Sequence, residues 1–260
     1  MIAVKGTWGI LLALSACMSL YANRIETPKP EFRQTYALNP NGRVVVQNLY
    51  GDVDIQAWDR DQVLVLAFKK SSDPRRLDDA RVVVDSSGDL VSIRTQYAGA
   101  DAEHPASVDY RIMVPRGANL ENVKLINGGL SISGVSGPVK ASSVNGSIHA
   151  EHLQGQADLS TVNGRLDAGF ERVGRCNVIN LSSVNGPIQL SIPSSAGAVV
   201  EAKNLSGGIE SAFGHPWRGS DGHQLKALVN HGGAQIRVKN VNGGILIRAT
   251  AARRSPRPWT

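Results

Sequence analysis

A short motif recurs seven times along the chain. Each copy is anchored on a glycine and follows the template Φ-x-Φ-x-x-Φ-Asn-Gly-x-Φ-x-Φ, where Φ is apolar. Asn precedes the glycine in five copies, and Tyr50 and Ser206 stand there in the other two. The corner residues are Gly51, Asn127, Gly128, Asn145, Gly146, Asn163, Gly164, Asn185, Gly186, Gly207, Asn242 and Gly243. Because a unit this short cannot bury its own apolar face, the copies are expected to stack.

Three positions of the template are apolar in all seven copies: five before, two before and two after the glycine. The column two before it consists of Leu49, Ile126, Val144, Val162, Val184, Leu205 and Val241. We expect each column to run along the stack and to be buried by the neighbouring copy. Val144, Val162 and Val184 should then lie one above another.

Each copy is expected to form two short strands joined at a corner. Apolar residues at alternate positions bury one face of a strand. The apolar spacing changes from two to three across polar pairs such as Ser142-Ser143, so we expect the bend there. Asn-Gly tolerates positive φ, and asparagines at equal places in successive copies can form a hydrogen-bonded ladder. The sequence therefore predicts an all-β fold, a parallel β-solenoid resembling a β-helix.

An antiparallel β-meander or sandwich is the alternative fold, because Asn-Gly between apolar runs is also a hairpin signal. Pro187 argues against it, since the residue after a two-residue turn donates its backbone N–H and proline has none. The steps between anchoring glycines are 77, 18, 18, 22, 21 and 36 residues. The 36-residue step equals two steps of 18, and the 77-residue step leaves room for about four.

These steps indicate one repetitive β domain over residues 35–249. Its part 35–118 is expected to be a degenerate form of the same architecture, and its part 119–249 carries the regular repeats. Helix is expected only in short pieces, and residues 73–79 are expected to be one helical turn or a loop.

The N-terminal segment 1–22 has the features of a secretory signal peptide. Lys5 gives a short positive region, and the apolar run that follows is too short to span a bilayer. Cleavage is expected before Cys17, which ends a lipobox-like Leu-Ser-Ala-Cys and would carry the lipid; cleavage after Ala22 is the alternative. Residues 23–34 are expected to be a linker. The chain is thus predicted to be exported and lipid-anchored in the cell envelope, or else periplasmic or secreted.

The chain carries a formal net charge of +6, and part of this excess lies in a tail, residues 250–260, expected to be disordered. A basic exported protein is attracted to acidic polysaccharides and anionic lipid surfaces, and envelope proteins are the other expected partners. The sequence shows no basic stripe interleaved with aromatic residues, so no nucleic-acid partner is expected.

The N-terminal copy of the motif carries a resemblance. Residues 45–59, with Val63-Leu64-Val65 after them, resemble the opening of the bacterial putative-adhesin family of unknown function. The strand ending in Val114-Pro115 and leading into Gly-anchored repeats is similar to a later hallmark of that family. The resemblance covers residues 43–249. It implies an exported β-repeat domain and transfers no catalytic or binding residue.

No group of residues in the sequence predicts catalysis. Asp52 and Asp54 share a strand face, but the equivalent positions in other copies carry no acidic ladder, as a carbohydrate-active enzyme would need. His149-Ala150-Glu151-His152 lacks the helical spacing of zinc hydrolases and a third ligand. We therefore expect no enzyme activity, metal or cofactor.

Three further features have structural interpretations. Cys176, the only cysteine beyond Cys17, is expected to be a buried inert thiol. Trp58 is expected to pack beside its strand pair, although Trp58 and Trp217 could stack on sugars if exposed. Residues 214–222 are expected to form a projecting loop, where binding residues often lie.

Together these observations predict a non-catalytic, adhesin-like surface or envelope scaffold. A carbohydrate-active enzyme on the same scaffold, or an accessory or sensor subunit of an envelope complex, are the alternatives.

Overall fold

Each copy of the motif forms one rung of two strands that meet at the Asn-Gly corner. In a representative rung, β10 (Val139–Asn145) runs to the corner and β11 (Ile148–Leu153) leaves it. The computed structural model describes residues 30–98, 106–213, 217–218 and 222–251. The leader with Cys17 lies outside the described residues, as do positions 252–260 of the tail.

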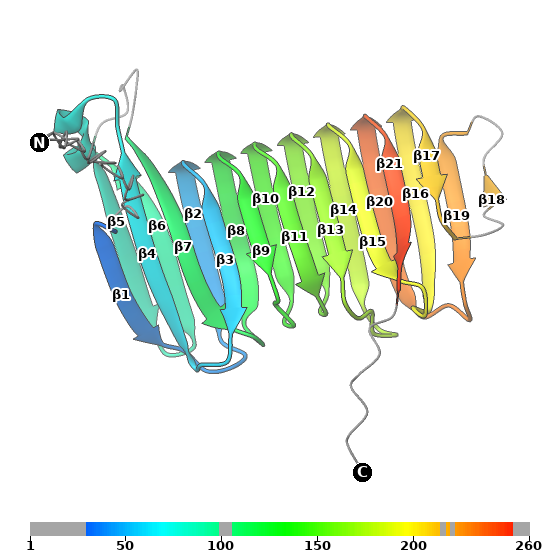
Figure 1. Ribbon diagram of the computed structural model, residues 1–260, viewed down its shortest axis with the longest axis horizontal. Coiled ribbons are helices and arrows are strands. Elements are labelled where there is room, and N and C mark those ends of the chain that lie inside the picture. Colours follow the sequence, from blue (N-terminus) through cyan, green and yellow to red (C-terminus); the bar gives the residue numbers. More distant parts are fainter. Residues whose placement is uncertain (1–29, 99–105, 214–216, 219–221, 252–260) are drawn as a thin grey trace, which may run out of the picture.

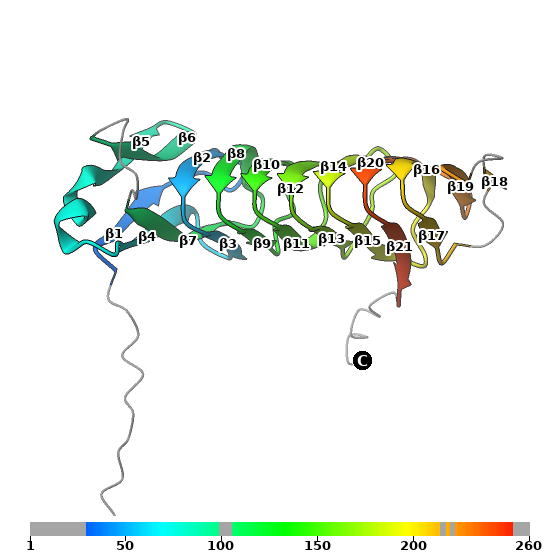
Figure 2. The same cartoon turned by 90° about the horizontal axis from the view of Figure 1, so that it is seen from above.

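The strands before the corners form one sheet and the strands after them form another, and Figure 2 shows the two sheets as separate layers. Within the described residues, sheet A has ten strands in the order β1-β4-β7-β3-β9-β11-β13-β15-β21-β17. Sheet B has eleven, in the order β18-β19-β16-β20-β14-β12-β10-β8-β2-β6-β5. Figure 1 shows the rungs side by side along the long axis of the molecule.

The remaining strands of sheet A are β1 (Phe32–Ala37), β3 (Val53–Trp58), β4 (Gln62–Lys70), β7 (Ser107–Pro115), β9 (Leu130–Ser133), β13 (Leu166–Phe170), β15 (Ile188–Pro193), β17 (Ile209–Ser211) and β21 (Ile245–Thr250). Those of sheet B are β2 (Arg43–Tyr50), β5 (Ala80–Ser87), β6 (Leu90–Tyr97), β8 (Asn119–Asn127), β12 (Ala157–Asn163), β14 (Val178–Asn185), β16 (Ala198–Ser206), β18 (Trp217–Arg218), β19 (Gln224–Val229) and β20 (Ala234–Asn242). A short 3₁₀ helix, η1 (Pro74–Asp79), precedes β5, where one helical turn or a loop was expected.

The repeated rungs pair in parallel and in register, so the predicted solenoid is confirmed. Ser143 lies beside Thr161, and Asn145 lies beside Asn163, as the 18-residue step requires. The antiparallel alternative is wrong for the repeats. Among the residues that the structure describes, antiparallel pairs occur only toward the two ends of the stack: β1 with β4, β4 with β7, β5 with β6, β16 with β19, and β18 with β19.

The order of rungs departs from the order of the sequence in two places. The rung β20–β21 lies between β14–β15 and β16–β17, so the last repeat of the sequence is not the last of the stack. The rung β2–β3 stacks directly on β8–β9. The 77-residue step between them therefore holds one further parallel rung, β6 and β7, with antiparallel β4 and β5, instead of about four rungs. The 36-residue step holds β18 and β19 instead of a second rung.

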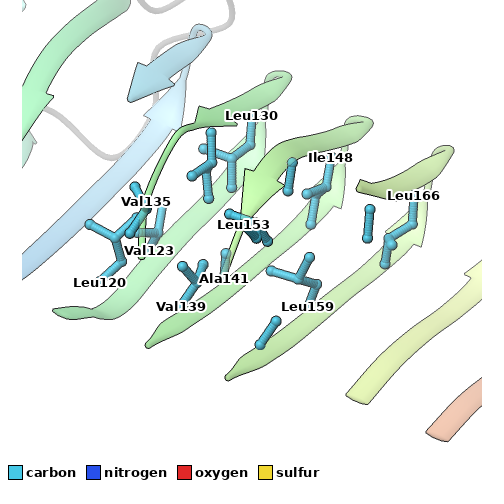
Figure 3. Close-up of a cluster of buried hydrophobic side chains, with 14 of the residues drawn as sticks. Leu120, Val123, Leu130, Val135, Val139, Ala141, Ile148, Leu153, Leu159 and Leu166 are labelled. Atoms are coloured by element: carbon cyan, nitrogen blue, oxygen red, sulfur yellow. The ribbon is translucent and has the colours of Figure 1, made fainter. Parts of the chain in front are cut away.

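Aliphatic columns between the two sheets make the core. The columns five before and two after the glycine point inward, and Leu159 and Leu166 of one rung are fully buried. Figure 3 shows such side chains from successive rungs, including Ala141 and Ile148, lying together between the strands. Because each layer is thin, small β-branched and aliphatic residues fill most of it, and Tyr110 and Phe170 are the aromatic residues buried among the described ones.

The column two before the glycine points outward, so the expectation that it is buried is wrong. Val144, Val162 and Val184 lie on neighbouring, in-register strands, as expected, but they are 37%, 38% and 39% exposed. The physical reason is that the strand continues past the polar pair. Ser143 and Thr161 point inward instead, and the chain turns two residues later, at Asn-Gly.

The corner asparagines form the expected ladder along the stack. The side-chain amides of Asn145, Asn163, Asn185 and Asn242 each donate to Oδ1 of the preceding asparagine in the stack, all at 2.9 Å. The glycines that follow them permit close stacking of the rungs. A Cβ on Gly146 would lie 1.9 Å from the carbonyl oxygen of Gly128. This distance is too short for any side-chain atom.

The two ends of the described chain differ in detail from expectation. β1 begins at Phe32, inside the segment 23–34 that was expected to be a linker. β21 ends at Thr250, the first residue of the expected tail. Among the described residues, no helix has the length and apolarity needed to cross a bilayer.

Candidate functional site

A row of exposed aliphatic side chains runs along sheet B beside the corners. This apolar ladder has seven members: the exposed Leu49, Ile126, Val144, Val162, Val184 and Leu205, and the partly buried Val241. Among the six exposed members, the exposed fraction rises from 37% at Val144 to 44% at Leu49 and 73% at Leu205. Single exposed aliphatic residues are ordinary on a protein surface, but a contiguous row of this length marks an interaction surface.

Buried polar residues beneath the ladder fix its outward direction. Thr161 is 3% exposed, and its hydroxyl donates to the carbonyl of Gly146 at 2.9 Å. Ser143 donates in the same way to Gly128 at 3.3 Å. Asn204 and Asn240 occupy the equivalent place in their rungs and donate to Gly243 and Gly186. Because these inward residues bind the corner of the neighbouring rung, the next residue must face solvent.

A shallow groove of about 360 Å³ follows the ladder across four rungs of sheet B. Val144, Val162 and Val184 line one side, and Ser142, Ser160 and Ser182 lie in the next outward row. The groove ends at the rung that carries Lys239 and Val241.

Basic side chains surround this groove on the outer face of sheet B. In the row next to the ladder, Lys124 precedes the three serines, and Lys239 and Lys203 follow them. The row beyond contains Lys140, Arg237 and Lys226, with Asp158 and Glu201 among them. Lys226 lies 3.0 Å from Glu201, and the hydrogen bond between them lowers the pKa of Glu201. Six basic and two acidic side chains on two adjacent rows give this face a net positive charge.

The outer face of sheet A has a separate groove of about 490 Å³, crossing β4, β7, β3, β9 and β11. Asp52, Asp54 and Asp109 all line it, which the sequence did not predict. Asp52 accepts a hydrogen bond from the backbone N–H of Gly129 at 2.7 Å. Asp109 accepts from the backbone N–H of Asp52 at 3.0 Å.

The other charged groups of this groove also have partners. Asp109 pairs with Lys70, and this hydrogen bond raises the pKa of Lys70. The guanidinium of Arg111 lies 5.2 Å from the ring centroid of Phe68. Asp54 accepts from the side chain of Gln56 at 2.9 Å. Two of the three carboxylates thus bind backbone of the rungs, which is a structural role.

The two histidines of the segment 149–152 are not arranged as ligands of one metal ion. His149 Nε2 is 3.3 Å from Glu151, while His152 has a positive φ of 56° at the end of its rung. Within the described ranges, no group of three or more His, Cys, Asp and Glu side chains is placed to hold a metal ion.

Cys176 is exposed, so the expectation of a buried thiol is wrong. It lies in a turn in which the N–H of Asn177 donates to the carbonyl of Gly174 at 3.0 Å, just before β14. This rung has a 22-residue step, and the residues added to the usual 18 form the turn instead of strand.

Trp58 is half-buried at the end of β3, and its indole N–H donates to the carbonyl of Gln62 at 2.8 Å, which agrees with packing beside its strand pair. In the segment 214–222, the backbone of β18 pairs with β19, and positions 214–216 and 219–221 lie outside the described residues.

The sequence-predicted corner residues lie together in one line, but the apolar ladder beside them was not predicted as a surface. The sequence contains the signal for it. In every rung the ladder residue lies an odd number of positions from the buried residue five before the glycine. A continuous strand therefore places it on the opposite face.

Comparison with known proteins agrees with this geometry. The family model described as Toastrack DUF4097 matches residues 30–248. A putative cell adhesion protein from Clostridium sporogenes aligns with a TM-score of 0.50 at 12% identity, over 85% of this chain and 100% of that one. A putative adhesin from Bacteroides fragilis gives a TM-score of 0.39 at 10% identity, over 83% of this chain and 96% of that one.

At 12% identity, the likeness to the Clostridium sporogenes protein shows a shared fold and nothing more. No curated protein sequence matches the chain. Because the family model covers nearly all of the described rungs, this chain belongs to the Toastrack DUF4097 family.

Proposed function

We propose that this protein is an exported, non-catalytic scaffold that acts as an adhesin does, by presenting one face of its solenoid to a partner in the cell envelope. The observation that carries the proposal is the exposed apolar ladder on sheet B, bordered by lysines. A row of aliphatic residues in seven rungs is more than stacking requires, since polar residues would pair equally well on an outer face.

The test is binding of the purified chain to isolated bacterial envelopes. A Cys17→Ser background removes any acyl anchor, so no attached lipid contributes to the binding. In this background, Val144→Ser, Val162→Ser and Val184→Ser together should reduce binding at least tenfold. The matched control changes His149, Asp167 and Gln189 to Ser, one row on the sheet A side of the same three rungs. Equal binding by both triple variants would contradict the choice of surface.

Export and anchoring belong to the same proposal and rest on the leader sequence. The wild-type chain should incorporate a labelled fatty acid in bacteria and fractionate with membranes, whereas Cys17→Ser should not. Absence of label in the wild-type chain would leave cleavage after Ala22 and a freely soluble protein.

A carbohydrate-active enzyme is the second candidate, favoured by the convergence of Asp52, Asp54 and Asp109 in one groove. General acid and base catalysis needs two carboxylates free to exchange protons with substrate. Of these three carboxylates, Asp54 is the one whose partner, the side chain of Gln56, is neither a backbone N–H nor a cation. Turnover of an acidic polysaccharide that Asp54→Asn abolishes would favour the enzyme over the scaffold.

A further inference from the structure

We infer that the partner of the sheet B face is a lipid bilayer rich in anionic lipids, with the apolar ladder among the headgroups and the lysine rows on their phosphates. This inference rests on the proposed function, since it names the partner of the same surface. Two properties of the face support this inference, and each argues against a different competing partner.

The first property is the shape and chemistry of the ladder. Seven rungs spaced about 4.8 Å apart give a straight apolar row of about 29 Å. All its members are Val, Ile or Leu, so the row has no ring on which a sugar could stack. Aliphatic groups in one line on successive rungs can enter the boundary between headgroups and acyl chains together.

The second property is the position of the basic residues. Lys124 lies at one end of the serine row and Lys239 and Lys203 at the other, all exposed. Lys140 and Arg237 extend the charge over the next row. Basic residues beside an apolar surface are the arrangement that binds anionic headgroups, because the two attractions act on the same plane.

A second copy of this chain is a poorer partner for the face. Paired ladder to ladder in parallel directions, two copies would place each set of lysine rows opposite the uncharged corner residues of the other copy, which cannot neutralise them. In antiparallel directions, the two copies would bring one set of lysine rows against the other. Such like charges repel across an interface. A soluble acidic polysaccharide would neutralise the lysines but leave the aliphatic row in water. Only the anionic bilayer uses both properties.

The experiment is sedimentation with protein-free vesicles, using the full chain in the Cys17→Ser background. Vesicles of phosphatidylglycerol and phosphatidylethanolamine should bind it, and vesicles of phosphatidylcholine alone should not. Raising the ionic strength from about 0.1 M to about 1 M shortens the Debye length from about 10 Å to about 3 Å and should weaken binding strongly.

Two triple variants separate the two contributions. Lys124→Gln, Lys203→Gln and Lys239→Gln together should weaken vesicle binding on the order of 100-fold, since each lysine near an anionic surface contributes about fivefold. Val144→Ser, Val162→Ser and Val184→Ser together should weaken it roughly tenfold. The His149, Asp167 and Gln189 control should bind as the parent does, and denaturant midpoints show that every variant is folded.

Several outcomes would overturn the inference. They are equal binding to phosphatidylcholine, no effect of either triple variant, or binding to soluble alginate but not to vesicles. A dimer in light scattering that the ladder variant dissociates would assign the face to a second copy. If the chain binds isolated envelopes through the ladder yet ignores vesicles, the bilayer is wrong and the adhesin-like scaffold stands.

Discussion

The side-chain amide of Asn163 donates a hydrogen bond to Oδ1 of Asn145 at 2.9 Å, and Oδ1 of Asn163 accepts the equivalent bond from Asn185. Each corner asparagine between its neighbours is thus both donor and acceptor. This asparagine ladder joins corner asparagines that are 18 to 57 residues apart in sequence. It continues across the point where the rung order departs from the sequence, because Asn242 donates to Asn185.

Substituting Asn163 by Ala should lower the free energy of unfolding by about 1–2 kcal/mol, because two hydrogen bonds are lost at a solvent-exposed position. Urea denaturation of the purified chain measures this. Asn122→Ala is the control, since this asparagine faces outward on β8 outside the ladder, and its effect should stay within about 0.5 kcal/mol. An equal effect of both substitutions would show that the asparagine ladder adds no stability.

Gly146→Ala should destabilise the protein by about 3 kcal/mol or more, because its Cβ would meet the backbone of Gly128 at 1.9 Å. The rungs cannot separate there without breaking parallel pairing on both sides. Gly208→Ala is the matched control, since a Cβ at that corner has no neighbour within 4 Å. Denaturation midpoints that fall equally for both variants would contradict the close approach of the rungs.

Thr161→Val should cost about 1–3 kcal/mol, because the carbonyl of Gly146 loses its donor while the side chain keeps its volume. The equivalent Ser183 is also buried, but its hydroxyl has no hydrogen-bond partner. Ser183→Ala should therefore leave the stability unchanged or raise it slightly. A loss at Ser183 as large as that at Thr161 would mean that the hydroxyl column does not act through the glycine carbonyls.

Tyr110 should make the protein less stable in alkali. Its hydroxyl lies 2.7 Å from Thr95, which donates to Asn48, so Tyr110 is the donor of that pair. Burial raises the pKa of Tyr110 to about 12, so the folded protein holds this proton more tightly than the unfolded chain does. The contribution of Tyr110 to the free energy of unfolding should be constant below about pH 10 and fall by about 1.4 kcal/mol per pH unit between about pH 10 and 12.

Urea denaturation at successive pH values tests this. Tyr110→Phe should have a shallower alkaline decline, although not a flat one, because burial also raises the pKa of Tyr97. A decline that is unchanged in Tyr110→Phe would assign it to other groups.

The sequence predicted the stack because its signal is periodic and local. The inward residues Leu159 and Leu166, the asparagine ladder and the parallel register all follow from one repeated template. The template also contained the outward direction of Val162, but its change of spacing suggested a bend at Ser160-Thr161. The inward hydrogen bond of Thr161 to a neighbouring rung, which keeps the strand straight, depends on stacking and is invisible in one copy.

The order of the rungs could not be predicted, because it depends on contacts between distant segments. β14 and β16 have equally suitable apolar columns to pair with each other, and only the full set of pairings places β20 between them. The sequence did not predict the groove that contains Asp52 and Asp109 for the same reason, because these two residues are 57 positions apart in the chain. Exposure of Cys176 depends on where the extra residues of one rung loop out, which no periodic pattern specifies.

Leu159 and Val162 give the sharpest test of the two apolar columns, since they lie three residues apart on β12 and look equivalent in the template. Leu159 is fully buried between the sheets, so Leu159→Ala should cost about 2–5 kcal/mol, through lost burial and the cavity left in a thin core. Val162 is 38% exposed and lies on the outer face between the strands of Val144 and Val184, so Val162→Ala should cost less than about 1 kcal/mol. Denaturant unfolding of both variants distinguishes the columns. Similar losses would mean that the apolar ladder is part of the core. Folding alone would then explain why all seven rungs have an apolar residue there, and no binding partner would be needed. A small loss at Val162 leaves that apolar character without a folding explanation, and binding becomes the remaining reason for it.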